Sequence, residues 1–129
     1  MKLEMDIQKQ IEYWIKTAED DLVSAGLLIQ NERYLHGLFF CHLCIEKSIK
    51  AHVVKETNQI PPKLHNLSFL LSKTNLLLTT DFKELTAILM TYLLEGRYPE
   101  NYPQTPSAEE AKDYLARTKN LFIWLKSKL

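Results

Sequence analysis

The chain has 129 residues, of which 46% are hydrophobic and 25% are charged, and its sixteen basic residues balance its sixteen acidic ones. This length and composition fit one globular domain, and the balanced charge argues against a broad basic face for nucleic acid or for an anionic membrane. We therefore predict a single helical domain over residues 1–129, with any RNA contact confined to a local site.

Apolar residues recur every three or four positions along most of the chain, which is the period of a helix. The spacing predicts helices over about 6–30, 34–56 and 66–73, a fourth from residue 80 or 81, and a last one from 107 to the C-terminus. Asn66 fits an N-cap, and Ser107 with Glu110 forms a capping-box pattern. The predicted fold is all-α, an antiparallel four-helix bundle with an extra short helix.

The linker 95–106 is the exception among mostly short loops, because it is long for a compact bundle. Its three prolines are interspersed with Arg97, Tyr98 and Tyr102. Long loops often carry function, and two tyrosines in a loop indicate that it packs against the bundle. The linker is therefore the first candidate site.

A second candidate lies on the predicted helix 34–56, where His42, Glu46 and Lys50 share one face at four-residue spacing. This face borders the apolar stripe, so Glu46 is expected to be partly buried and to need a cationic partner. The forked guanidinium of Arg97 suits that role. The alternative is an ordinary ladder of ion pairs on the surface of the helix.

The remaining cysteines and histidines have simpler interpretations. Cys41 and Cys44 lie in mid-helix without further ligands, which favours packing in the core over a zinc or redox site. His65 either caps the following helix or approaches a phosphate, and His52 is expected to be solvated. The sequence has no glycine-rich phosphate loop and no H-E-x-x-H, so it predicts no metal and no cofactor.

The N-terminal residues, the apolar runs and the cysteine count indicate the cellular location of the protein. Residues 1–10 carry Glu4 and Asp6 and lack the apolar core of a signal peptide, and no apolar run approaches the roughly 20 residues that cross a bilayer. Two cysteines do not make a disulfide framework. We therefore predict a cytoplasmic protein with no membrane contact.

Several motifs, taken together and in order over nearly the whole chain, resemble the HEPN family. They are Trp14-x-x-x-Ala18-x-x-Asp21-Leu22-x-x-Ala25, Tyr34, Phe39-Phe40, Glu46-Lys47-x-x-Lys50-Ala51, Pro62-x-x-His65-x-Leu67-x-x-Leu70 and Arg97-Tyr98-Pro99.

The resemblance implies a prokaryotic helical bundle, usually a homodimer and often encoded beside a minimal nucleotidyltransferase in a toxin–antitoxin pair. Many HEPN proteins are metal-independent endoribonucleases. In these an arginine holds the scissile phosphate, and a histidine that follows after four to six residues helps to activate the 2′-hydroxyl. The arginine corresponds to Arg97, but positions 102–104 are Tyr102, Pro103 and Gln104, so that histidine is missing.

Two functions follow from these observations. The first is a nucleotide- or RNA-binding interaction module, which pairs with itself and with a nucleotidyltransferase. Its ligand site would be lined by Arg97, Tyr98, Tyr102, Glu46, Lys50 and His42. The second is an endoribonuclease with a degenerate motif, in which Arg97 acts with Tyr102 or with His65; a tyrosine is a poor general base at neutral pH. A third interpretation is that Arg97 only pairs with Glu46 and stabilises the bundle.

Overall fold

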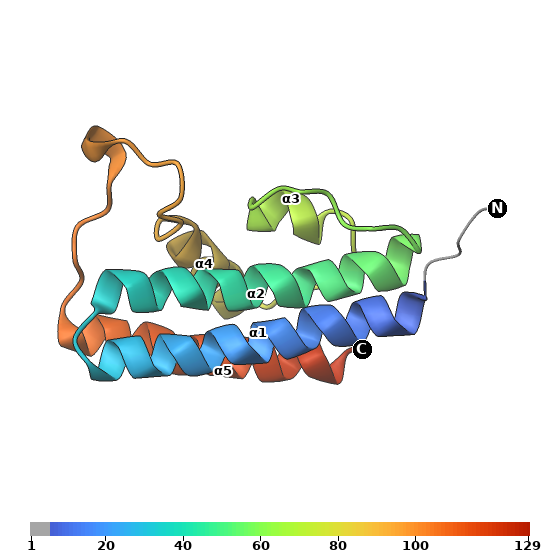
Figure 1. The fold of residues 1–129 in the computed structure, drawn as a ribbon, viewed down its shortest axis with the longest axis horizontal. Coiled ribbons are helices and arrows are strands. Elements are labelled where there is room, and N and C mark those ends of the chain that lie inside the picture. The colour runs from blue at the N-terminus through green and yellow to red at the C-terminus, as the bar shows by residue number, and fades with distance from the viewer. Residues whose placement is uncertain (1–5) are drawn as a thin grey trace.

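The structure, a computed structural model, describes residues 6–129 as a bundle of helices (Figure 1). Residues 1–5, part of the segment in which no signal peptide is predicted, lie outside the described residues. The helices are α1 (Ile7–Gln30), α2 (Tyr34–Thr57), α3 (Leu67–Leu71), α4 (Thr80–Met90) and α5 (Ala108–Ser127), with one 3₁₀ turn, η1 (Pro99–Asn101), in the linker. None of these helices combines the length and the apolar character needed to cross a membrane.

The helix ends lie within two residues of the predicted ones, and side chains cap the N-termini of α1, α3, α4 and α5. The side chain of Asp6 accepts a hydrogen bond from the backbone N–H of Lys9, so α1 begins at Ile7. Asn66 caps α3, and Ser107 forms the predicted capping box with Glu110 at the start of α5. No strand occurs among residues 6–129, and the predicted all-α bundle is confirmed.

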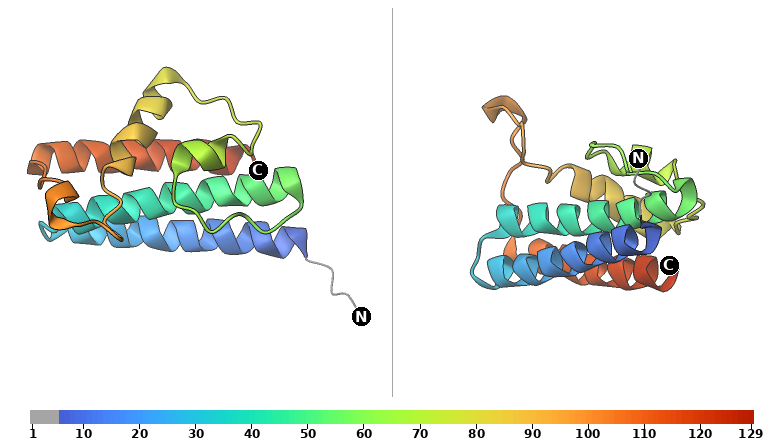
Figure 2. Two further views of the ribbon diagram at one scale, coloured as in Figure 1. Left: turned by 90° about the horizontal axis from the view of Figure 1, so that it is seen from above. Right: turned by 45° about the vertical axis from the view of Figure 1, so that its right-hand side comes forward.

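Helix α2 is the central element of the bundle. Helix α1 runs antiparallel along it, α5 lies against both of them, and the short α3 and oblique α4 cover a further side of α2 (Figures 1 and 2). At Gly37 the first two helices approach so closely that an added Cβ would lie 2.5 Å from Cγ1 of Ile29. A side chain at this position of α2 would therefore require the Ile29 side chain or α1 itself to shift.

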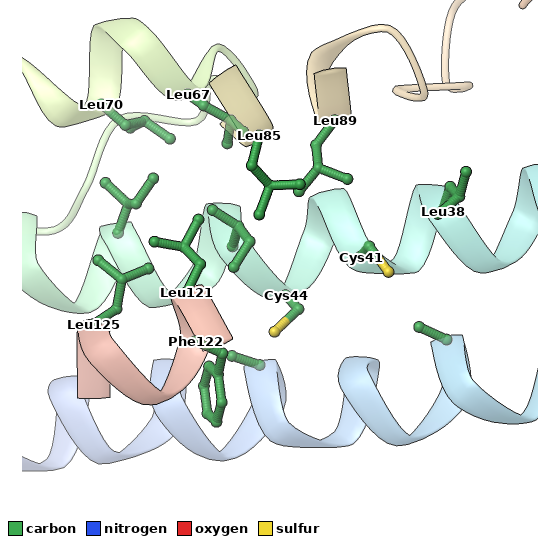
Figure 3. Packing of buried hydrophobic residues seen from close by; sticks show 14 of the residues in the cluster. Leu38, Cys41, Cys44, Leu67, Leu70, Leu85, Leu89, Leu121, Phe122 and Leu125 are labelled. Atoms are coloured by element: carbon green, nitrogen blue, oxygen red, sulfur yellow. The ribbon is translucent and has the colours of Figure 1, made fainter. Parts of the chain in front are cut away.

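The core forms where leucines of α3, α4 and α5 converge on α2 (Figure 3). Cys41 and Cys44 are fully buried in this core, so the packing interpretation of the two cysteines is confirmed. Burial raises the pKa of the Cys41 thiol to about 12, which keeps it protonated and unreactive.

Because neighbours cover α2 on several sides, its polar residues are buried as well. His42, Glu46, Lys50 and His52 are each at most 6% exposed. The surface-ladder interpretation of the first three is therefore wrong. The expectation of a solvated His52 is also wrong, because its Nε2 lies 2.8 Å from the carbonyl oxygen of Leu125 in α5.

The linker between α4 and α5 extends away from the helices, as the orange segment in Figures 1 and 2 shows. Tyr98 is 70% exposed and Tyr102 is 43% exposed. The expectation that these tyrosines pack against the bundle is therefore wrong. The linker presents two aromatic rings to solvent instead.

Candidate functional site

A buried carboxylate, Glu46, is the centre of the candidate site. Its Oε2 accepts a hydrogen bond from Nζ of Lys50 at 3.1 Å, and its two oxygens lie 3.0 and 3.1 Å from Nδ1 of His65. Nδ1 of His42 lies 3.6 Å from Oε1 of the same carboxylate. We call these four residues the Glu46 cluster. A carboxylate that is only 3% exposed needs such partners, because burial without them costs several kcal/mol.

Two segments of the chain build the Glu46 cluster. His42, Glu46 and Lys50 lie one helical turn apart on α2, as the sequence predicts. His65 comes from the segment between α2 and α3, which returns over α2 after the helix ends at Thr57. The predicted capping role of His65 is wrong, since Asn66 caps α3 and His65 pairs with the carboxylate.

His42 is the least compensated member of the cluster. It is fully buried, and neither of its ring nitrogens has a hydrogen-bond partner within the described chain. Burial lowers the pKa of His42 to about 4, although the charge of Glu46 acts in the opposite direction. His42 therefore remains neutral at physiological pH.

Residues of α1 contact the lysines of α2 in and beside the Glu46 cluster. Nζ of Lys50 lies 5.4 Å from the ring centroid of Trp14, within the range of a cation–π interaction. One turn away, Nζ of Lys47 lies 2.7 Å from Oδ2 of Asp21, which joins the two helices again. The charged face of α2 is thus held by residues of α1 that belong to the resemblance pattern.

Arg97 binds the backbone of its own linker rather than Glu46. Its Nε donates to the carbonyl of Leu93 at 2.8 Å, its Nη2 to Met90 at 3.0 Å, and its Nη1 to Asn101 at 3.2 Å. Met90 is the last residue of α4, where carbonyls lack partners within the helix. The predicted pairing of Arg97 with Glu46 is therefore wrong. The guanidinium instead joins the end of α4 to residue 101 and so holds the first half of the linker in shape.

Glu95, which the sequence analysis missed as a site residue, connects the linker to the Glu46 cluster. Its Oε2 lies 3.9 Å from Nε2 of His65, and the two side chains are 68% and 44% exposed. Its only sequence signal is its place two residues before Arg97. Tyr98 and Tyr102 make no hydrogen bond or ion pair with the Glu46 cluster within residues 6–129, so the site has a buried part and an exposed part joined at Glu95 and His65.

The part of the chain that the structure describes contains no group of three or more His, Cys, Asp and Glu side chains placed to hold a metal ion.

A short bundle with a polar centre on its second helix and a long linker before its last helix defines a class of small all-α domain. A profile of the HEPN domain matches residues 11–128, and the chain therefore belongs to the HEPN domain family, as the resemblance predicts.

Two solved structures share the fold. The protein TT1696 from Thermus thermophilus has a TM-score of 0.78 and 20% identity, over 93% of this chain and 98% of that one. ST0689, described as an archaeal HEPN homologue, has a TM-score of 0.67 and 24% identity, over 92% of this chain and 96% of that one. A comparison with curated proteins gave no match.

His42 provides a test of the buried half of the site by pH. Between pH 6.5 and about 4, His42 is protonated in the unfolded chain but stays neutral in the folded protein. The free energy of unfolding therefore decreases as the pH falls through this range. The difference between the two pKa values of His42 corresponds to about 3 kcal/mol of unfolding free energy. We expect His42→Leu to flatten the acid limb of a stability curve measured by denaturant unfolding between pH 4 and 7.

The control is His36→Leu, because His36 is exposed at the start of α2. That variant should keep the acid limb of the unmodified protein. Parallel curves for the His42 variant and the unmodified protein would show that His42 does not supply this pH dependence.

Proposed function

We propose that this HEPN-domain protein binds nucleotides or RNA at the linker 95–106 and acts as an interaction module. The observation that carries the proposal is the exposure of Tyr98 and Tyr102 on a linker whose first half Arg97 closes through backbone hydrogen bonds. Exposed aromatic rings are the surfaces on which single-stranded bases stack. A linker already held in shape loses less conformational freedom when it binds.

The proposal gives the buried residues a supporting role. Glu46, Lys50 and His42, which the sequence predicts as ligand-binding, are too deeply buried to touch a ligand directly. They support His65, whose side chain is 44% exposed, and His65 faces Glu95 at the base of the linker. Contact with the ligand then falls to the linker and to His65.

The linker tyrosines provide the main test of binding. We expect Tyr98→Ala and Tyr102→Ala each to weaken binding of a single-stranded RNA roughly tenfold, because base stacking contributes about 1–3 kcal/mol per base. Fluorescence anisotropy measures the dissociation constant. Tyr13→Ala is the matched control, since Tyr13 is an exposed tyrosine on α1 and should leave binding unchanged.

Arg97→Lys separates charge from shape in the same titration. Lysine keeps the positive charge but lacks the planar fork that reaches three backbone carbonyls. We expect it to weaken binding as much as Arg97→Ala does. Full binding by the lysine variant would contradict the proposed positioning role, and full binding by both tyrosine variants would contradict the proposed site.

The interaction part of the proposal comprises a homodimer and a partner protein. A groove between α1 and α5 exposes Val23 and Leu27 and has Glu19 and Lys119 on its rim, one charge of each sign. A twofold-related second copy fits such a surface, because in a twofold dimer the same apolar patch of each copy covers that of the other. We extend the proposal to a minimal nucleotidyltransferase partner in a toxin–antitoxin pair, on the family resemblance alone.

Self-association is testable at the groove. We expect Leu27→Glu to convert a dimer into a monomer, because a carboxylate buried at an apolar interface is strongly unfavourable. Light scattering coupled to size-exclusion chromatography gives the molar mass. Leu77→Glu is the control, since Leu77 is an exposed leucine in the loop before α4, and a monomeric unmodified protein would contradict the proposal.

A second candidate function is metal-independent RNA cleavage, and the Glu46–His65 pair favours it. A carboxylate that holds Nδ1 of an imidazole leaves Nε2 free to take a proton. In this reaction Nε2 accepts the 2′-hydroxyl proton, the 2′-oxygen attacks phosphorus, and the bond to the 5′-oxygen breaks. The leaving oxygen takes up a proton, and the products are a cyclic phosphate and a 5′-hydroxyl.

His65 is the residue that tests cleavage. We expect RNA incubated with the protein in a chelator to give products ending in a cyclic phosphate, and His65→Ala to slow their formation at least a hundredfold. His36→Ala should cleave at the unmodified rate, because His36 is exposed on α2 and is not part of the Glu46 cluster. Intact RNA after incubation with folded protein would exclude this candidate and leave the binding proposal standing.

A further inference from the structure

His65 is the member of the Glu46 cluster that reaches solvent, and its ring has two different sides. Nδ1 faces both oxygens of Glu46 at 3.0 and 3.1 Å. Carboxylate oxygens only accept hydrogen bonds, so Nδ1 carries the hydrogen. In the neutral imidazole the outward Nε2 is then an acceptor.

Glu95 faces the outward Nε2 of His65. Its Oε2 lies 3.9 Å from Nε2 of His65, which is too long for a hydrogen bond between them. The Glu95 carboxylate is an acceptor as well. Two acceptors from different segments of the chain therefore face a shared space that solvent reaches.

The chemistry of this space limits what it binds. A phosphate is an anion and an acceptor, so Glu95 repels it. A ligand that fits must place two donors on neighbouring atoms. The 2′- and 3′-hydroxyls of a ribose do so. One hydroxyl donates to Nε2 of His65, and the other donates to the carboxylate of Glu95.

We propose that Nε2 of His65 and the carboxylate of Glu95 form a binding site for the 2′,3′-cis-diol of a ribose. This inference rests on the proposed nucleotide binding and not on cleavage. It assigns the sugar to the base of the linker, next to Arg97, and leaves the nucleobase to the exposed tyrosines further along. The diol belongs either to a free ribonucleotide or to the 3′ end of an RNA.

Buried residues fix the orientation of the His65 ring. Lys50 compensates the charge of Glu46 at 3.1 Å, and Glu46 in turn holds Nδ1 through both oxygens. An exposed histidine without such support would lose rotamer freedom on binding. The buried half of the site thus prepares the exposed half.

Calorimetry with adenosine 5′-monophosphate and its 2′-deoxy and 3′-deoxy analogues tests the diol directly. We expect each analogue to bind roughly tenfold more weakly, since a hydrogen bond to a charged acceptor contributes about 1.5–3 kcal/mol. An RNA oligonucleotide with a free 3′ diol is compared with the same oligonucleotide bearing a 3′-phosphate. Weaker binding of the deoxy nucleotides supports the diol site. Weaker binding of the oligonucleotide with a 3′-phosphate assigns the RNA end, and equal binding of the two oligonucleotides assigns the free ribonucleotide.

Glu95→Gln is the informative variant, because Glu95 is exposed and the substitution should not disturb folding. It should weaken binding of the ribonucleotide and reduce the discrimination against the deoxy analogues, because the amide oxygen of glutamine still accepts a hydrogen bond but carries no charge. Glu100→Gln is the matched control, as Glu100 is an exposed glutamate of the same linker and should change neither quantity.

The outcomes separate this inference from the proposed function. Binding that depends on Tyr98 and Tyr102 but is equal for ligands with and without the diol overturns the diol site and leaves the proposed function intact. Discrimination that persists unchanged in Glu95→Gln also overturns it. A protein that binds neither nucleotide nor RNA overturns both proposals.

Discussion

The buried negative charge of Glu46 is the constraint on which the rest of this structure depends. A carboxylate withdrawn from water needs a positive partner and hydrogen-bond donors, and removing one of them typically costs about 3–5 kcal/mol. Lys50 supplies the charge from the next turn of α2, and His65 supplies a donor from the segment before α3. The requirement therefore fixes how that segment crosses α2, and it fixes the orientation of the exposed imidazole.

The central position of α2 explains why polar side chains are buried in so small a domain. A surface helix keeps one polar face, but α2 is covered by α1, α5, α3 and α4 together. Polar groups on such a helix must find partners within the protein. Glu46 finds several, whereas the ring nitrogens of His42 find none among the described residues, which makes His42 the least favourable polar group of the core.

Sequence patterns predicted the helices and the N-caps at Asn66 and Ser107, because those features depend on neighbours a few residues away. Asn66 and Ser107 act on the turn that follows them, so their roles can be read directly. The sequence left undecided whether Glu46 is buried or lies on the surface, because periodicity does not reveal how many sides of a helix are covered. The partner of Arg97 was predicted wrongly, because the prediction considered only the complementary charge of Glu46. The carbonyls of Met90 and Leu93, at and just after the end of α4, have no i+4 donor within the helix and are closer to Arg97 in the sequence.

These corrections change which groups are available for recognition. Arg97 directs its fork at backbone carbonyls, and Lys50 is enclosed with Glu46, so neither offers a free cation in the arrangement described. The exposed groups at the site include two tyrosine rings, the imidazole of His65 and the carboxylate of Glu95. Such groups suit base stacking and hydrogen bonds with hydroxyls, which is why we propose nucleotide binding at this site. In the proposed site, selectivity for a ribonucleotide would depend on the shape of the linker and on the orientation of the His65 ring, and contacts within the chain set both.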